Sequence, residues 1–472
     1  MRGDCLSILG HPAVETPNMD QLARKGVLFH NAYSATPTCV PARAAIFTGM
    51  SQRSHGRVGY EEKIPWDYEH TLPGELANAG YHTQCIGKMH VAPTRNLMGF
   101  HNVVLHDGYL HHNRFKQTNS VAESFDQCDD YLPWLRERAG SGVDLTDLGL
   151  DCNASTVARP WHLAEALHPT NWVVTQSIDF LRRRDPRKPF FLWMSFVRPH
   201  PPFDPPQAYF DMYKDLDFPD PVVGDWAQHD DRDKEGLNPI TKSGQVPDRR
   251  LKRARAAYYA LITHLDDQIG RFMQNLEEYG ELNNTVIVFT SDHGELLGDH
   301  HLFRKALPYE GSANVPLIVS DPGGQLNLKH GLELSHITEL RDIMPTLLDA
   351  AGVAVPDTVD GNSLLPLCRG EQQVWRDYIH GEHTYEMMSN HYVTDGCEKY
   401  IWYSQTGEEQ YFDLVQDPQE LVNGIANPAY QARIELWRER LITELKNSEE
   451  GYVSEGRLIV GRTPKTCLQH IR

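Results

Sequence analysis

The segment from Thr36 to Gly49, TPTCVPARAAIFTG, places one cysteine where a helix is expected to begin. Pro41 suits the first helical position and Gly49 lies just past the predicted end. Cys39 would then lie at the helix N-terminus, where backbone N–H groups favour an anion, with the cation Arg43 four residues further on. Two interpretations follow for Cys39: a buried structural thiol, or a nucleophile whose thiolate is stabilised there.

Three apolar runs predict strands, and a polar cluster that contains histidine follows each run. YHTQCI precedes GKMH, with Lys88 and His90; PFFLWMSFV precedes RPHPPF, with His200; NTVIVFT precedes SDHGE, with Asp292 and His293. The carboxyl ends of parallel strands meet at one edge of a sheet, so we expect these side chains to share one site. Lys88 and His90 are two residues apart, and on an extended segment both would point to one side. Each cluster alone also fits a structural interpretation as a surface cation, a loop or turn histidine, or a cap.

Composition limits the partners. The sequence has 64 acidic and 45 basic side chains and a formal net charge of −19, which would repel a nucleic-acid backbone or an anionic membrane surface. Hydrophobic residues make up 40%, and no apolar run approaches the ~20 residues that span a bilayer. We therefore expect a globular protein with no nucleic-acid partner and no membrane insertion, in which a local cluster of cations holds any anionic substrate.

The cysteines and the N-terminal segment give evidence on the cellular compartment of the protein. Eight cysteines are spread along the chain without a CxxC pair, which indicates reduced, mostly structural thiols. The opening MRGDCLSILG has no basic segment followed by an apolar core, so no secretory signal is visible. The visible sequence thus predicts a cytoplasmic protein, and a periplasmic or exported one if a signal precedes it.

Helix and strand patterns alternate through most of the chain, which predicts an α/β fold with a largely parallel sheet covered by helices on both faces. From about residue 373 the pattern changes to antiparallel strands and a helix, so we expect a catalytic domain at 1–372 and a smaller α+β domain at 373–472. Segments 100–170 and 201–250 lack periodicity and are interpreted as long loops near the strand-end edge that shape a pocket. Their aromatic and histidine content suits a sugar or a phenol equally well.

Several motifs together carry a family resemblance. CVPAR matches the C-x-P-x-R element of the sulfatases, and GKMH, PHPPF, SDHGE, GDHHLFRKALPYEGSANVPLIV and PTLLDAAG follow in the family's order. Near the C-terminus, EEQYFDLVQDPQELVN resembles the family's "yDL..DP.E..N" element. The chain thus resembles, over nearly its whole length, a sulfatase of the alkaline-phosphatase-like superfamily. The resemblance implies a large, mostly parallel sheet sandwiched by helices, plus a smaller C-terminal α+β domain with an antiparallel sheet.

The resemblance also implies the chemistry of the cysteine. Cys39 would be oxidised by a formylglycine-generating enzyme to Cα-formylglycine, and one hydroxyl of its hydrate would attack sulfur and expel the alcohol. Loss of the proton from the second hydroxyl, with His90 as base, would then release sulfate and restore the aldehyde. Arg43 would orient the hydrate, and His200 would protonate the leaving oxygen.

The resemblance implies that the remaining residues bind the sulfate group and a metal ion. Lys88 and Lys305 would hold the sulfate group, although Lys305 on its own could be merely an exposed cation. Asp292 and His293, with the modified residue 39, would bind one divalent cation, Ca²⁺ by preference with Mg²⁺ as the alternative.

The sequence departs from the family pattern at its start. Sulfatases begin with a buried strand that ends in an Asp-Asp or Asp-Gln pair, which supplies two further metal ligands, and this sequence starts inside that junction. Asp4 falls too late to replace the pair. We expect the natural product to carry further residues before Met1; if Met1 is the true start, we expect low stability and weak metal affinity. Ala42 replaces the serine of many members, and we expect oxidation of Cys39 to proceed.

The predicted function is hydrolysis of an organic sulfate monoester to alcohol and sulfate, with a carbohydrate sulfate favoured. The alternatives are a phosphonate monoester or phosphodiester hydrolase of the same superfamily, and a metal-poor, non-catalytic binder of sulfated glycans. A thiol hydrolase or a disulfide enzyme, in which Cys39 stays unmodified, ranks third. The oligomeric state is open.

Overall fold

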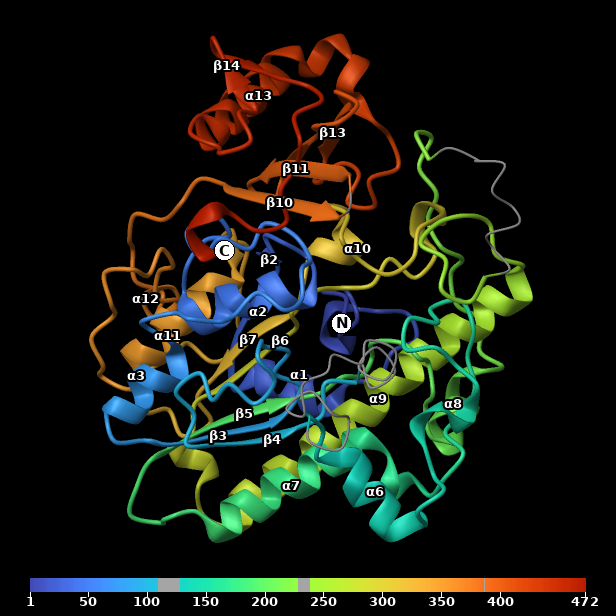
Figure 1. The fold of residues 1–472 in the computed structure, drawn as a ribbon, viewed down its shortest axis with the longest axis vertical. Helices are drawn as coiled ribbons and strands as arrows, with labels where there is room; N and C mark the ends of the chain where they lie inside the picture. The colour runs from blue at the N-terminus through green and yellow to red at the C-terminus, as the bar shows by residue number, and fades with distance from the viewer. Residues whose placement is uncertain (109–127, 228–237, 386) are drawn as a thin grey trace.

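The computed structural model describes residues 1–108, 128–227, 238–385 and 387–472. Figure 1 shows a large α/β body that carries the N-terminus, and a smaller antiparallel sheet above it that is packed against α13. The α-helices are α1 (Pro17–Arg24), α2 (Cys39–Thr48), α3 (Leu72–Asn78), α6 (Tyr131–Ala139), α7 (Pro169–Arg183), α8 (Gln207–Tyr213), α9 (Asp248–Glu278), α10 (Glu310–Ala313), α11 (Ile343–Ala350), α12 (Leu365–Cys368) and α13 (Gln431–Leu445). The strands are β1 (Gly26–Phe29), β2 (Ala32–Tyr33), β3 (His82–Gly87), β4 (Asn102–Leu105), β5 (Phe190–Ser195), β6 (Ile287–Thr290), β7 (Leu317–Ser320), β8 (Leu332–Leu334), β9 (Thr338–Glu339), β10 (Ile379–Tyr385), β11 (Met388–Thr394), β12 (Glu398–Tyr403), β13 (Glu409–Asp413), β14 (Val453–Ser454) and β15 (Arg457–Leu458).

The body contains two main sheets. The strand order β4-β3-β5 is fully parallel, whereas in β6-β7-β1-β8 the strand β7 runs antiparallel to both of its neighbours. The fold class predicted from the sequence, mostly parallel strands with helices and a C-terminal antiparallel sheet, is confirmed. The differences are that the described body strands form two main sheets and a short pair, β2-β9, rather than one sheet, and that β7 is reversed.

The edge strands β5 and β6 of the two main sheets lie on two sides of one cavity. Among the described strands, β5 pairs only with β3 and β6 only with β7, so one edge of each has no strand partner. A cavity of 280 Å³ lies between them, lined by both strands and by Met1. The side chains of β5 and β6 are accordingly only partly buried over most of their length, unlike those of β1 and β7.

Helices cover both faces of the sheets. On one face, α7 and α9 pack against β3 and β5 through a core that includes Trp172, Val173 and Phe272. On the other, α2 buries Phe47 against Trp193 of β5, and α3 packs on α11. In Figure 1 the helices α7 and α9 lie below and beside the sheets, and α2, α3 and α11 lie on the opposite side.

Two local predictions need correction. Helix α2 begins at Cys39 rather than at Pro41. A proline can occupy any position of the first turn, because the backbone N–H that it lacks would have no hydrogen-bond partner within the helix there. Gly49 caps the C-terminal end of the helix in the left-handed region, with φ of 66°. The segments interpreted as long loops also contain regular structure, namely β4, α6 and α8. Residues 109–127 and 228–237 of those segments lie outside the described residues.

The helices of the described ranges include none that is long and apolar enough to cross a membrane. The longest, α9, has a buried run from Ala256 to Asp266, and charged residues lie towards both of its ends.

The C-terminal sheet is an antiparallel meander, β10-β11-β12-β13, whose register is continuous across all three pairs. One face packs on α13 through Tyr400, Trp402 and Trp437. The other face contacts the body: the Tyr392 hydroxyl donates to the carbonyl of Ser34 at 3.0 Å.

Lys399 of β12 joins this sheet to the body through a buried ion cluster. Its side chain is fully buried, and Nζ lies 2.6 Å from Oε1 of Glu310 in α10, 2.8 Å from Oε1 of Glu420 and 2.8 Å from the carbonyl oxygen of Pro308. Burial raises the pKa of Glu420 to about 7 despite the nearby lysine. One buried carboxylate, that of Glu420, and one partly buried carboxylate, that of Glu310, therefore depend on one cation.

Replacing Lys399 with methionine is expected to lower the free energy of unfolding by about 3–5 kcal/mol, because Glu420 would stay buried, beside Glu310, without a cation. Urea denaturation monitored by circular dichroism measures the change. The matched control is Lys214→Met, which breaks an exposed ion pair with Asp211 and should leave the midpoint almost unchanged. Equal midpoints for the two variants would contradict the assignment.

Candidate active site

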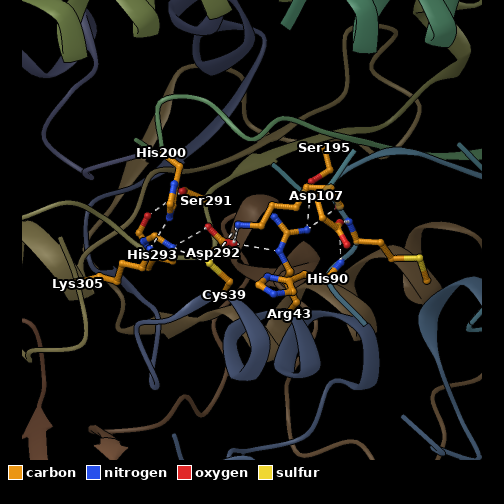
Figure 2. A network of polar contacts seen from close by, with 12 residues as sticks. Cys39, Arg43, His90, Asp107, Ser195, His200, Ser291, Asp292, His293 and Lys305 are labelled. Atoms are coloured by element: carbon orange, nitrogen blue, oxygen red, sulfur yellow. Dashed lines mark hydrogen bonds and ion pairs between the residues drawn. The ribbon is translucent and has the colours of Figure 1, made fainter. Parts of the chain in front are cut away.

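Cys39 lies fully buried at the first position of α2, inside a group of basic side chains (Figure 2). Nζ of Lys88 lies 3.1 Å from its Sγ, and Nε2 of His293 lies 3.3 Å from the same atom. Although burial alone would raise the pKa of the Cys39 thiol, Lys88, Lys305 and His293 hold it well below its usual value. The side chain at position 39 is therefore surrounded by groups that stabilise negative charge.

Asp292 is the carboxylate of this group. Its Oδ2 accepts a hydrogen bond from Nε of Arg43 at 3.0 Å and lies 3.5 Å from Nζ of Lys88. Burial would raise its pKa, but Lys88, His293 and Arg43 together hold the pKa far below the usual range. Arg43 also donates through Nη1 to the Lys88 carbonyl at 2.8 Å and to Oγ of Ser195 at 3.1 Å. Arg43 thus braces the strand ends that carry Lys88 and Asp292.

His200 and Lys305 form a pair on the other side of Cys39 (Figure 2). Nζ of Lys305 lies 2.6 Å from Nε2 of His200, and Nδ1 of His200 lies 2.8 Å from the carbonyl of Pro201. That carbonyl can only accept, so it places the proton on Nδ1 and leaves Nε2 to accept from the lysine. Burial and the charges of Lys305 and Lys88 hold the pKa of His200 well below its usual value, and burial lowers the pKa of Lys305 to about 8.

His90 completes the group from the end of β3. Burial would lower its pKa, but Cys39 and Glu62 raise it to about 9. Its backbone is left-handed, with φ of 60°, so the expectation that Lys88 and His90 share an extended segment is wrong. The two side chains converge because the chain turns after Gly87, and Asp107 holds that turn: its Oδ1 accepts from the N–H of Met89 at 2.8 Å and of His90 at 3.0 Å.

The structure brings together all eight predicted site residues, and the strand ends explain how. Gly87 and Ser195 are paired at the ends of β3 and β5, and Asp292 follows the end of β6. A cavity of 40 Å³ adjoins the group, lined in part by Lys88, His200 and His293.

Three side chains of this group could hold a metal ion. Ligand atoms of Cys39, Asp292 and His293 all lie within 4.8 Å of one another. Asp4 lies elsewhere, because both of its oxygens bind the guanidinium of Arg2 and its side chain is 56% exposed. The amino group of Met1 donates to Oγ of Ser291 at 2.6 Å and to the carbonyl of His293 at 2.8 Å.

Sequence reasoning missed several neighbours of the site. Asp107 and Ser195 position Lys88, His90 and Arg43 through hydrogen bonds that have no local sequence signal. Cys152 packs against Cys39 from a distant segment. All eight cysteines lie in the described ranges and none forms a disulfide, as the scattered spacing predicted.

Comparisons with known proteins show which family the chain belongs to. The sulfatase family model matches residues 1–353, and a model described as N-sulphoglucosamine sulphohydrolase, C-terminal, matches residues 298–447. An arylsulfatase of Clostridium perfringens is 57% identical over 472 residues, which is all of this chain and 98% of that protein. The multifunctional alkaline phosphatase superfamily protein PehA of Trinickia caryophylli is 30% identical, with 93% of each chain covered.

Solved structures show the same fold. The phosphonate monoester hydrolase of Agrobacterium radiobacter superposes with a TM-score of 0.74 at 27% identity, covering 94% of this chain and 93% of that one. A protein solved in complex with its substrate D-glucosamine-2-N,6-O-disulfate superposes with a TM-score of 0.70 at 22% identity, covering 94% and 95%. The chain belongs to the sulfatase family and is a sulfate ester hydrolase with an alkaline-phosphatase-like fold.

Proposed function

We propose that this sulfatase works through Cys39 after its conversion to Cα-formylglycine, with the surrounding side chains in separate roles. The observation that carries the proposal is the convergence of Lys88 Nζ and His293 Nε2 on Sγ, at 3.1 and 3.3 Å. Sγ stands in for the oxygens of the formylglycine hydrate. When present, that hydrate supplies two hydroxyls on one carbon, so that one can attack sulfur and the other can later drive release of sulfate.

Two cations hold the substrate's sulfate group in this proposal, and a third supports them. Lys88, which follows β3, and Lys305, in the loop before α10, approach position 39 and hold the sulfate oxygens, while Arg43 keeps its guanidinium on Asp292 and on the backbone of Lys88. Because these cations are already in place, they stabilise the charge that grows on the transferring group without reorganising. Arg43 therefore braces the anion site, and direct orientation of the hydrate is left to the lysines.

Two histidines move protons. His200, whose Nε2 contacts Lys305, passes a proton to the leaving alcohol oxygen. Because His200 alone is neutral in the unliganded site, this proton comes from the His200–Lys305 pair. His90 lies on the other side of position 39. The Cys39 thiolate that helps to raise its pKa is absent once formylglycine has formed, so His90 can then be neutral and take the proton from the second hydroxyl.

The proposed metal group is residue 39 with Asp292 and His293. A carboxylate, an imidazole and the oxygens of a formylglycine hydrate suit a hard divalent cation that completes its shell with water or substrate oxygens, and we propose Ca²⁺, with Mg²⁺ as the alternative. Such an ion, when bound, offsets charge on the substrate and on the hydrate.

The substrate is a sulfated small molecule or saccharide, and we favour a carbohydrate sulfate. A formylglycine-generating enzyme would act on Cys39 during maturation. The proposed division of the chain is a catalytic domain at 1–372 and a smaller domain at 373–472.

A second candidate activity is hydrolysis of phosphonate monoesters or phosphodiesters. The similarity to PehA and to the Agrobacterium radiobacter phosphonate monoester hydrolase favours it, because a site for one tetrahedral anion accepts another of similar size.

The first prediction concerns the reaction. Protein whose Cys39 peptide shows formylglycine by mass spectrometry should hydrolyse an aryl sulfate faster than the matching aryl phosphonate, and Cys39→Ala should lose at least about 10³-fold in kcat. The control is Cys368→Ala, a buried thiol of α12, which should keep its activity. Faster phosphonate turnover would favour the second candidate, and absence of both activities in modified, calcium-loaded protein would favour the non-catalytic binder.

The second prediction concerns pH. Lys305 has a pKa of about 8, so its charge is fully present below that pH and is lost above it. KM for an aryl sulfate should therefore rise as the pH passes 8, whereas Lys305→Arg, which stays charged, should show no such rise. A wild-type KM that stays flat to high pH would contradict the sulfate-binding role.

The third prediction concerns Asp107 as a positioning residue. Asp107→Ala frees the turn that carries His90 and should lower kcat by about 10- to 100-fold, with a smaller change in KM. Asp130→Ala is the matched control, since Asp130 also accepts from a backbone N–H, that of Leu105 at 2.6 Å, but has no contact with His90 in the described structure. An equal loss in both variants would show a merely structural effect.

A further inference from the structure

A second group of potential metal ligands lies in the C-terminal sheet, on the face of β10 opposite to the one that carries His383. His380 and Glu382 alternate onto one face of β10, and His391 of β11 is the direct cross-strand partner of Glu382. His383 points to the other face, where its Nε2 lies 3.1 Å from Oγ1 of Thr38, next to Cys39. The strand register therefore gathers two imidazoles and a carboxylate at a place separate from the candidate active site.

The three side chains are buried, and each has one polar atom without a hydrogen-bond partner. His380, Glu382 and His391 are 8%, 2% and 0% exposed. Nε2 of His380, Oε1 of Glu382 and Nδ1 of His391 have no hydrogen-bond partner in the described parts of the chain, and one ligand atom from each residue lies within 4.8 Å of the others. Nδ1 of His391 lies 3.6 Å from Oε2 of Glu382. A buried polar atom that lacks a partner costs about 1–3 kcal/mol, so three in one buried group favour a common partner.

The charge balance around the group favours an additional cation. Arg53 holds the second oxygen of Glu382, Oε2, at 2.6 Å and is shared with Oε2 of Glu450 at 3.3 Å, so two carboxylates face one guanidinium. Burial holds the pKa of both histidines well below the usual value, which keeps them in the neutral form that binds metals. Burial also raises the pKa of Glu382 to about 7 despite Arg53, and a cation would restore its charged form.

The outer contacts fix the orientation of the ligands. Arg53 holds Oε2 of Glu382 and so leaves Oε1 for the ion, and Oγ of Ser389 lies 3.3 Å from Nε2 of His391, where it can accept the ring proton and leave Nδ1 bare. Binding through Nε2 of His380 puts the ring proton on Nδ1. Nδ1 of His380 can then no longer accept a hydrogen bond from the Gln52 amide nitrogen, which lies 3.3 Å away. The 2.9 Å hydrogen bond from that nitrogen to the His380 carbonyl remains.

We propose that His380, Glu382 and His391 bind one divalent transition-metal ion of the zinc class. Two imidazole nitrogens and one carboxylate oxygen form a ligand set of this class, with a fourth position left for water. Bonds of ~2.1 Å in a tetrahedral site put ligand atoms about 3.4 Å apart, so small side-chain rotations close the site. Because Arg53 comes from the loop after α2 and Glu450 from the segment after α13, the ion stabilises the junction of the body, the C-terminal sheet and the chain's last segment.

The test measures zinc binding by the full chain with Cys39→Ala in every sample, which removes the thiolate at the active site, and with excess Ca²⁺ present. Zn²⁺ is titrated against a chromophoric chelator, and bound metal is counted by mass spectrometry after dialysis. His391→Phe and Glu382→Gln each remove a ligand with little change in shape. Tyr452→Phe is the control, since its ring packs on His391 at 4.9 Å but supplies no ligand.

One equivalent of zinc is expected in the parent and in Tyr452→Phe, with affinity at least about 100-fold weaker in His391→Phe and about tenfold or more weaker in Glu382→Gln. Co²⁺ should give visible d–d absorption in the parent that His391→Phe lacks. If His391→Phe does not fold by circular dichroism, Glu382→Gln and the cobalt spectrum of the parent decide the question. Absence of zinc and cobalt binding in the parent, or equal affinity in the parent and in folded ligand variants, would overturn the proposal.

Discussion

The site depends on one electrostatic constraint: several cations are packed around position 39, with one carboxylate, that of Asp292, placed among them. Lys88 and Arg43 are almost fully buried, and both rely on Asp292 within 3.5 Å. Buried cations of this kind are costly unless they are paired, so Asp292 makes the cluster stable enough to exist. The charge that remains unpaired is directed at Cys39, which is where an anion is to be held.

The strand ends of the body and the C-terminal sheet together position these charged side chains. The ends of β3, β5 and β6 bring Lys88, Ser195 and Asp292 to one edge, as expected for ligand sites in α/β sheets. The C-terminal sheet closes the site from the other side, with His383 on Thr38 at 3.1 Å. The buried cluster of Lys399 joins that sheet to α10, and the smaller sheet forms part of the wall of the candidate active site.

Much of this could be predicted from the sequence, because it depends on local pattern. Apolar runs followed by polar clusters predicted three strand ends, and the motif CVPAR with its neighbours predicted which residues meet there. The left-handed turn at His90 could not be predicted, since the tertiary hydrogen bonds from its N–H and that of Met89 to Asp107 hold it. Likewise, the reversed direction of β7 depends on the pairing of its backbone with β1 and β6, and an apolar run of four residues carries no signal of direction. The group of His380, Glu382 and His391 could not be predicted from the sequence, because its members become neighbours only through the register of β10 with β11.

The most direct test of the cation cluster is calorimetric titration of inorganic sulfate into the Cys39→Ala chain and into the same chain with Lys88→Met. One sulfate ion should bind to the first, because the anion site is preformed, and the affinity should fall at least about tenfold in the second, which lacks one charge-assisted contact. The account would be contradicted if sulfate did not bind to the first chain, or bound to both with equal affinity.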